Sequence, residues 1–268
     1  MPISPARPVA FVLASTHQGT MIVNRNDYNI TRDVAYGVGH QLLANSSFDQ
    51  QEVNFALQLL STRHKHFGQG VVAVDCGANI GVHTLEWAKH MHGWGRVMAF
   101  EAQERIFYAL AGNIALNNCF NAQALWAAVG ETVGDIGVPV PNYLKPASFG
   151  SLEIRKTART EYIGQQIDYN RLVKTRMISI DSLDLDRVDF LKIDIEGMEM
   201  EALRGAQQTI ARHKPQMMIE KIKTNEEQLT DFLKVRGYTL FPIDINILAV
   251  HESDPAVKMI RIEQGKRE

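Results

Sequence analysis

The sequence is poor in the features that mark secreted scaffolds, membrane proteins and nucleic-acid-binding proteins. It has two cysteines in 268 residues, without C-x-x-C spacing, so we expect free thiols in a reducing compartment rather than a disulfide framework. No apolar run approaches the ~18 residues that suggest a membrane span. Residues 9–14 are too short for a signal-peptide core and are expected to form a short strand. The net charge of −2 gives no overall attraction to nucleic acid or an anionic membrane, and the cytoplasm is the expected compartment.

From residue 71 onward, short apolar runs alternate with stretches of helical periodicity. The runs predict strands at 71–74, 96–100, 124–129, 190–195 and 216–220, and the periodic stretches predict helices at 82–92, 106–117, 198–212 and 226–236. This alternation predicts an α/β protein with a mostly parallel sheet covered on both faces. Two last strands at 238–241 and 246–250, with no helix between them, predict an antiparallel hairpin at the sheet edge.

Two segments fall outside this alternation. Residues 1–67, with an amphipathic helix at 48–60, are expected to form an N-terminal extension that packs on the core domain, residues 68–268. An insertion at about 131–180 is expected to hold a small hairpin and a loop. Within it, Ser148 to Ser151 could form a lip over a ligand site, although a solvated loop is the simpler interpretation.

The first predicted strand ends in a glycine-containing loop. A dinucleotide loop would need glycine where Asn79 stands, and Asp75 would repel a pyrophosphate but suit a cationic amino-acid group. Gly77 and Gly81 permit the sharp turn into a helix and a close approach of a ligand. Glu101 ends the second strand, where a carboxylate accepts hydrogen bonds from ribose hydroxyls. Together these residues predict a nucleoside cofactor.

A second group of charged residues lies at the end of a later strand. Lys192 and Asp194 alternate with isoleucines, so both point to one face of a buried strand, which is costly unless the charges are paired or used. We assign a catalytic or substrate-orienting role to Asp194 and to Glu196 in the following turn. Glu220, which ends the next strand, could face the same cleft. Glu199 is assigned to electrostatics at a helix start.

These motifs together resemble the FkbM family of S-adenosylmethionine-dependent methyltransferases. The resemblance covers about residues 70–222 and is carried by residues 74–81 with Thr84, by the strand end at Glu101, by Asn117 and by residues 190–199. It implies a Rossmann-like class I methyltransferase fold with a seven-stranded, mostly parallel sheet whose last strand is antiparallel. It also implies S-adenosylmethionine as cofactor and methylation at oxygen. Gln103 departs from the family, which often has proline there.

The resemblance assigns the cofactor site to Asp75, Gly77, Asn79, Gly81, Thr84, Glu101 and Gln103. The expected acceptor is a hydroxyl of a sugar, glycan, lipid or natural product, with no nucleic acid involved. Asp194 or Glu196 is the candidate base, and Lys192 could stabilise the developing alkoxide. The same carboxylates could instead hold Mg²⁺, which is not favoured, and no metal ligand is assigned.

Two other functions stay open at this point. A nicotinamide-dependent oxidoreductase would share the fold, and a non-catalytic Rossmann-like module would share the binding loop. Asp75 and Asn79 count against the first, and the charged strand around Lys192 counts against the second. Among the histidines, His83 beside the cofactor loop is the one with a potential role.

Overall fold

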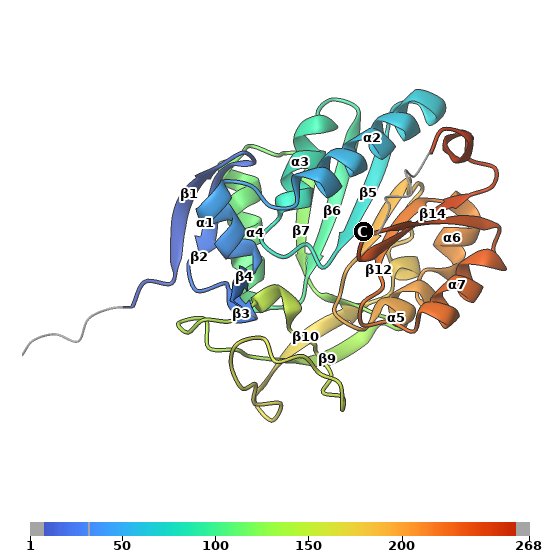
Figure 1. Cartoon of the computed structure of the whole chain (residues 1–268). Helices are drawn as coiled ribbons and strands as arrows, with labels where there is room; N and C mark the ends of the chain where they lie inside the picture. Colours follow the sequence, from blue (N-terminus) through green and yellow to red (C-terminus); the bar gives the residue numbers. More distant parts are fainter. Residues whose placement is uncertain (1–7, 32, 261–268) are drawn as a thin grey trace, which may run out of the picture.

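The computed structural model describes residues 8–31 and 33–260, and its centre is a seven-stranded sheet (Figure 1). The strand order is β13-β14-β12-β11-β5-β6-β7, and β14 alone runs antiparallel to its neighbours. This confirms the Rossmann-like fold with an antiparallel last strand. The strands are β5 (Val71–Cys76), β6 (Gly95–Glu101), β7 (Ala122–Trp126), β11 (Phe190–Ile193), β12 (Gln216–Glu220), β13 (Tyr238–Ile243) and β14 (Asn246–His251).

Helices cover both faces of this sheet, as the alternation predicts (Figure 1). One face carries α2 (Gln50–Phe67), α3 (Val82–His90) and α4 (Glu104–Leu116), and the other carries α5 (Glu199–Arg204), α6 (Gln207–His213) and α7 (Glu226–Lys234). Every residue of β5 is buried, because alternate side chains enter two cores. Ala73 packs in the core that holds Trp87, whereas Val74 packs in the core that holds Leu203.

Two predicted elements are broken in the structure. The helix predicted at 198–212 is divided into α5 and α6 at Gly205, where a Cβ atom would lie 2.2 Å from the Gly130 carbonyl oxygen. This close approach requires glycine, which also weakens a helix. The strand predicted at 124–129 ends at Trp126, and β8 (Ala128–Val129) joins a different sheet. Neither break can be predicted from local periodicity, because each one depends on a contact with the insertion.

The N-terminal segment packs on the core through a hairpin (Figure 1). β1 (Phe11–Thr16) pairs with β2 (Gly19–Asn24), and Asn113 on α4 accepts from the Ile22 amide at 2.5 Å and donates to its carbonyl oxygen at 3.2 Å. The segment continues through β3 (Asn29–Thr31), β4 (Val34–Tyr36) and α1 (Val38–Asn45). Parts of the predicted domains, residues 1–7, 32 and 261–268, lie outside the described residues.

The insertion contains its own small sheet. β9 (Gly134–Pro139) and β10 (Leu172–Ile178) form an antiparallel pair, and β8 lies parallel to β10 on the other side. The long loop between β9 and β10 includes a short turn of helix, η1 (Phe149–Ser151), and lies below the central sheet in Figure 1. Two further turns, η2 (Ile180–Leu183) and η3 (Pro255–Lys258), complete the described elements. Across the described ranges, the helices are too short or too polar to cross a membrane.

Candidate active site

A cavity of about 410 Å³ opens where the carboxyl ends of β5, β6, β11 and β12 meet the insertion loop and the N-terminal segment. Ligands of open α/β sheets bind at this edge, and the volume lies within the ordinary range for small-molecule sites. Nine of the residues predicted from the sequence line it: Asp75, Gly77, Asn79, Glu101, Gln103, Lys192, Asp194, Glu196 and Glu220. The structure therefore brings both predicted motifs to one cavity.

The turn after β5 has the conformation that the glycines suggested. Gly77 has φ +83°, and a Cβ atom there would lie 1.7 Å from the Asp194 carbonyl oxygen, so no other residue fits. Gly81, with φ +94°, begins α3 and does not line the cavity. Its role is to permit the turn, because a Cβ atom there would press against Leu110 at 2.8 Å.

Asp75 and Thr84 form a buried pair behind the turn. The Thr84 hydroxyl donates to Asp75 Oδ2 at 2.6 Å, and both side chains are buried. Thr84 does not reach the cavity, which corrects its assignment as a cofactor contact: it positions Asp75 instead. Asp75 Oδ1 is buried, and no group in residues 8–31 and 33–260 forms a hydrogen bond with it. Such an oxygen is costly unless a ligand group donates to it.

Glu101 is held by backbone amides at the end of β6. Its carboxylate accepts from the Asn79 amide at 3.1 Å and from the Gln103 amide at 2.7 Å. Burial raises the pKa of Glu101 to about 7, against the opposing effect of these amide hydrogen bonds. Its exposed fraction is 7%, and it lines the cavity. The position is suited to a ligand that brings hydroxyl donors into the cavity.

Gln103 connects the turn after β6 to the insertion. Its Nε2 atom donates to the Phe149 carbonyl oxygen at 2.8 Å, and the Tyr143 hydroxyl donates to its Oε1 atom at 3.1 Å. A proline at this position would offer neither contact. Ser148 and Ser151, on either side of this contact, line the cavity, as the lip hypothesis expected. Gln103, where the family often has proline, therefore connects the insertion to the rim of the cavity.

Three carboxylates converge at the ends of β11 and β12. Oxygen atoms of Asp194, Glu196 and Glu220 lie within 4.8 Å of one another. Lys192 Nζ lies 2.7 Å from Asp194 Oδ2, and Lys223 forms an ion pair with Glu196. Glu220 Oε2 is buried without a hydrogen-bond partner in the part of the chain that the structure describes. The predicted pairing of Lys192 with Asp194 on one face is confirmed, and the lysines neutralise two of the three acids.

The crowding of charges shifts the titration of this group. Burial, followed by repulsion from Asp194 and Glu199, raises the pKa of Glu220 to about 8. Burial also raises the pKa of Glu196, against the opposing attraction of Lys223. For Lys192, burial alone would lower the pKa, but Asp194 and other carboxylates outweigh it and raise it. The site therefore holds a carboxyl group that is partly protonated near neutral pH beside a permanent ammonium.

The methyltransferase FkbM domain model matches residues 75–240, which is more than half of the chain and includes both motifs. The chain belongs to the FkbM methyltransferase family. Methyltransferase 1 of Beauveria bassiana is 28% identical over 49% of this chain and 57% of its own length. Methyltransferase sdnD of Sordaria araneosa is 27% identical over 49% of this chain and 59% of its own length. The chain thus matches less than two thirds of the length of these relatives.

Among solved structures, methyltransferase FkbM from Methylobacillus flagellatus is 22% identical, with a TM-score of 0.46. The similarity covers 68% of this chain and 43% of that one.

Among the cavity residues outside the stretch that matches the FkbM domain, Glu52 and Asn246 form a bonded pair. Glu52 on α2 accepts from Asn246 Nδ2 at 2.8 Å, and its other oxygen lies 3.1 Å from His83 Nε2. Although burial raises the pKa of Glu52, the His83 hydrogen bond and the charge of Lys192 lower it to about 2. Of these residues, the sequence motifs point to His83 and not to Glu52 or Asn246. Glu52 could have been noticed as an acid beside Val53 on the buried face of a helix.

Glu199 fixes the conformation of the loop that follows β11. It is fully buried, and its Oε1 atom accepts from the Ile195 amide at 3.2 Å and the Gly197 amide at 3.0 Å. These bonds hold Glu196 in the left-handed region, with φ +57°. Glu199 thus bonds amides of the loop that precedes α5, and this loop conformation turns Glu196 toward the cavity.

Proposed function

We propose that this FkbM domain transfers the methyl group of S-adenosylmethionine to a hydroxyl of an acceptor. The observation that carries the proposal is the unpartnered Asp75 Oδ1 in the same cavity as Glu101 and the three carboxylates. We call the part lined by Asp75 and Glu101 the cofactor end, and the part lined by Asp194, Glu196 and Glu220 the acceptor end. One cavity can then hold both reactants side by side.

The residues of the cofactor end fit S-adenosylmethionine. Asp75 would accept hydrogen bonds from the ammonium of the methionine part, and Glu101 from the ribose hydroxyls. Gly77 leaves the backbone open to close approach. When bound, S-adenosylmethionine supplies an electrophilic methyl group on a sulfonium. The cavity is rich in carboxylates, which favours a ligand of net positive charge over an anionic pyrophosphate.

At the acceptor end, the chain would orient a hydroxyl and take its proton. Asp194 or Glu196 is the proposed base, with Glu220 as a further proton acceptor when ionised. The Lys192 ammonium would stabilise negative charge that develops on the acceptor oxygen. Alignment of the oxygen with the methyl group contributes several kcal/mol by proximity alone. Two lysines already pair with Asp194 and Glu196, so we favour a mechanism without Mg²⁺.

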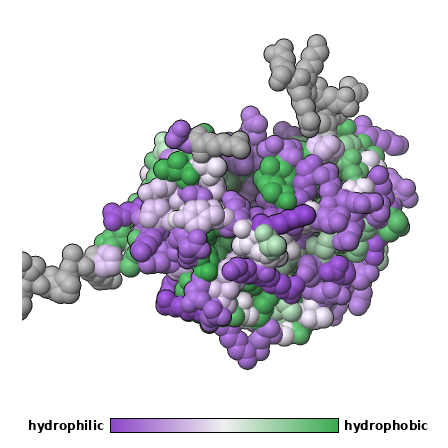
Figure 2. All heavy atoms as spheres, turned by 60° about the horizontal axis from the view of Figure 1, so that its bottom comes forward, coloured by the Kyte–Doolittle hydropathy of each residue, from purple (hydrophilic) through white to green (hydrophobic). Residues whose placement is uncertain are grey.

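The charge of the cavity also bears on the class of acceptor. Eight carboxylates and two lysines line it, and this surplus of negative charge would repel phosphates of a nucleic acid. Figure 2 shows that the face around the insertion is mostly hydrophilic, with hydrophobic side chains in small separate patches. We therefore propose a hydroxylated small molecule, glycan or lipid headgroup as acceptor. The free, buried cysteines agree with a cytoplasmic enzyme.

Binding and turnover experiments test this function in two steps. Calorimetry should detect S-adenosylhomocysteine binding, whereas NAD should neither bind nor raise the melting temperature. Stabilisation by NAD alone would support the oxidoreductase alternative. A panel of sugars, glycans and lipids, screened by homocysteine release, then searches for the acceptor. Cofactor binding without turnover on a broad panel would favour the non-catalytic module.

A further inference from the structure

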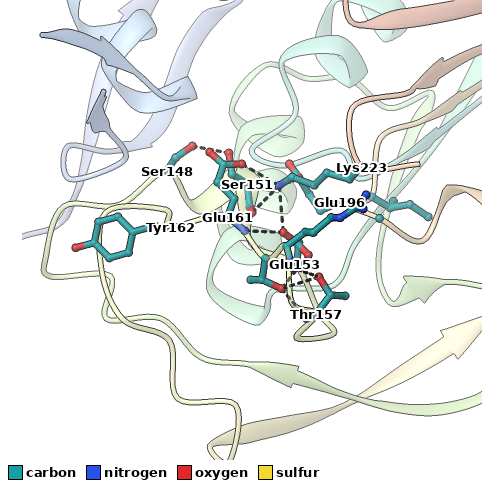
Figure 3. A network of polar contacts seen from close by, with 12 residues as sticks. Ser148, Ser151, Glu153, Thr157, Glu161, Tyr162, Glu196 and Lys223 are labelled. Carbon is teal, nitrogen blue, oxygen red and sulfur yellow. Dashed lines mark hydrogen bonds and ion pairs between the residues drawn. The ribbon is translucent and has the colours of Figure 1, made fainter. Parts of the chain in front are cut away.

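One ammonium group connects the insertion to the core of the acceptor end. Lys223 Nζ pairs with Glu196, lies 3.1 Å from Glu161 Oε2 and lies 3.9 Å from Glu153 Oε1. It also donates to the Ser151 carbonyl oxygen at 3.1 Å. Figure 3 shows Lys223 between the insertion side chains and Glu196. Glu196 belongs to the loop after β11, while the other three residues belong to the insertion, so Lys223 is the shared partner.

The N-terminal segment joins the same network. The Tyr36 hydroxyl donates to Glu161 Oε1 at 3.0 Å, while Asn29 Nδ2 donates to the Tyr36 oxygen at 2.7 Å and to the Tyr162 carbonyl oxygen at 3.1 Å. Glu161 therefore accepts from the N-terminal segment on one oxygen and faces Lys223 with the other. Tyr36, Glu161 and Lys223 all line the cavity.

The position of the Lys223 charge makes these contacts stronger than ordinary surface ion pairs. The side chains of Lys223, Glu153 and Glu196 are only 14%, 10% and 16% exposed. Partly buried, charge-assisted bonds are screened less than exposed ones. Without the ammonium, three carboxylates would face one another with no shared cation. Repulsion would then push residues 151–161 away from Glu196.

The insertion is also held at other points: the Phe149 amide donates to Asp27 Oδ1 at 2.9 Å, and the exposed Arg155 lies 2.7 Å from Glu201 on α5. Between β9 and β10 its only regular element in the described chain is η1. Its own polar contacts include the Ser148 amide with the Ile163 carbonyl oxygen at 2.7 Å and the Glu161 amide with Glu153 Oε1 at 2.9 Å. These bonds hold the loop to itself. Asp27 and Gln103 fix the loop at Phe149, whereas Lys223 connects residues 151–161 to Glu196 in the loop after β11.

We propose that Lys223 is the positioning residue of the acceptor end, holding residues 151–161 as a wall of the cleft and Glu196 in its place beside them. The functional part of this inference rests on the proposed methyl transfer, because that transfer defines which end receives the acceptor. The mechanical part does not depend on any ligand, and it can be measured on the protein alone.

Hydrogen exchange of the whole protein without cofactor tests the mechanical part. Lys223→Met keeps the length of the side chain and removes its charge, so the Ser151 and Glu161 amides should exchange ~10-fold faster or more. Lys223→Arg keeps the charge and should restore exchange to within ~2-fold of the wild-type rate. Lys221→Met is the matched control on the same loop, since the ion pair of Lys221 is with the exposed Glu226, at 3.5 Å, and not with the insertion. It should leave these amides unchanged.

Each outcome decides the proposal. Equal exchange in Lys223→Met and wild type, or failure of Lys223→Arg to restore the rate, would overturn it. If Lys223→Met does not fold, Glu161→Gln makes the test from the insertion side, and wild-type exchange in that variant would overturn it equally. Failure of the proposed function is seen separately, as absent S-adenosylhomocysteine binding by the wild-type protein, and leaves the exchange result intact.

Discussion

At the cofactor end of the cleft, Glu101 is held by backbone amides, whereas at the acceptor end Asp194 and Glu196 are held by lysine ammonium groups. Backbone donors do not titrate, and here they come from the turns that follow β5 and β6. Lys223 follows β12 and bridges to an insertion about 70 residues earlier in the chain. The cofactor end is thus built from one β–α–β unit, while the acceptor end depends on several distant segments.

The largest expected effect is a loss of turnover, without a loss of cofactor affinity, when a carboxylate of the acceptor end is replaced. Asp194→Asn or Glu196→Gln should lower turnover ~100-fold or more, because a general base acts in the transition state. Affinity for S-adenosylhomocysteine should change little, since neither residue belongs to the cofactor end. Turnover by homocysteine release and affinity by calorimetry measure the two effects. The exposed Glu227→Gln is the control, and wild-type turnover in both site variants would place the base elsewhere.

At the cofactor end, Glu101→Ala is expected to weaken cofactor binding. Loss of a charge-assisted acceptor for the ribose should weaken cofactor binding by ~1–3 kcal/mol. Calorimetry on the folded variant measures this loss directly. Glu104→Ala, three residues along and hydrogen-bonded to the exposed Tyr108, should bind as the wild type does. Unchanged affinity in Glu101→Ala would remove this residue from the site.

The two ends should also differ in their response to pH. Cofactor affinity should fall as pH decreases through about 7, because burial raises the pKa of Glu101 to that value and protonation removes the charged acceptor. Turnover at saturating cofactor should fall as pH decreases through about 8, the value to which burial and neighbouring carboxylates raise the pKa of Glu220. Below the respective pKa, cofactor affinity and turnover should each fall by up to ~10-fold per pH unit. Glu220→Gln should remove the fall in turnover near pH 8, and its persistence would assign that fall to another group.

The smallest expected effect is that of a chelator. Lys192 and Lys223 supply the positive charge that a divalent ion would bring to the acceptor end, so EDTA should leave turnover unchanged. Activity measured before and after chelation, with Mg²⁺ added back, tests this. If chelation lowers turnover and added Mg²⁺ restores it, Asp194, Glu196 and Glu220 would be identified as metal ligands. The proposal that the lysines replace a metal ion would then be wrong.

Most of the cofactor end could be predicted because its geometry is local. Asp75, Gly77 and Asn79 lie in one turn, and Glu101 follows at the end of the adjacent strand, so parallel pairing places them together. Thr84 was the exception. A helical residue one turn into α3 can face either the ligand or the sheet, and packing directs Thr84 to Asp75.

The sequence by itself determined the order of strands and helices, the sheet with its antiparallel last strand, and the two motifs at its carboxyl edge. Periodicity and glycine-bearing turns act over a few residues, so they are legible without contacts. Only the tertiary structure decided that Glu52 and Lys223 enter the cavity and that α5 and α6 separate at Gly205. These features follow from the packing of the N-terminal segment and the insertion on the core, and such packing joins residues too distant in sequence to share a pattern.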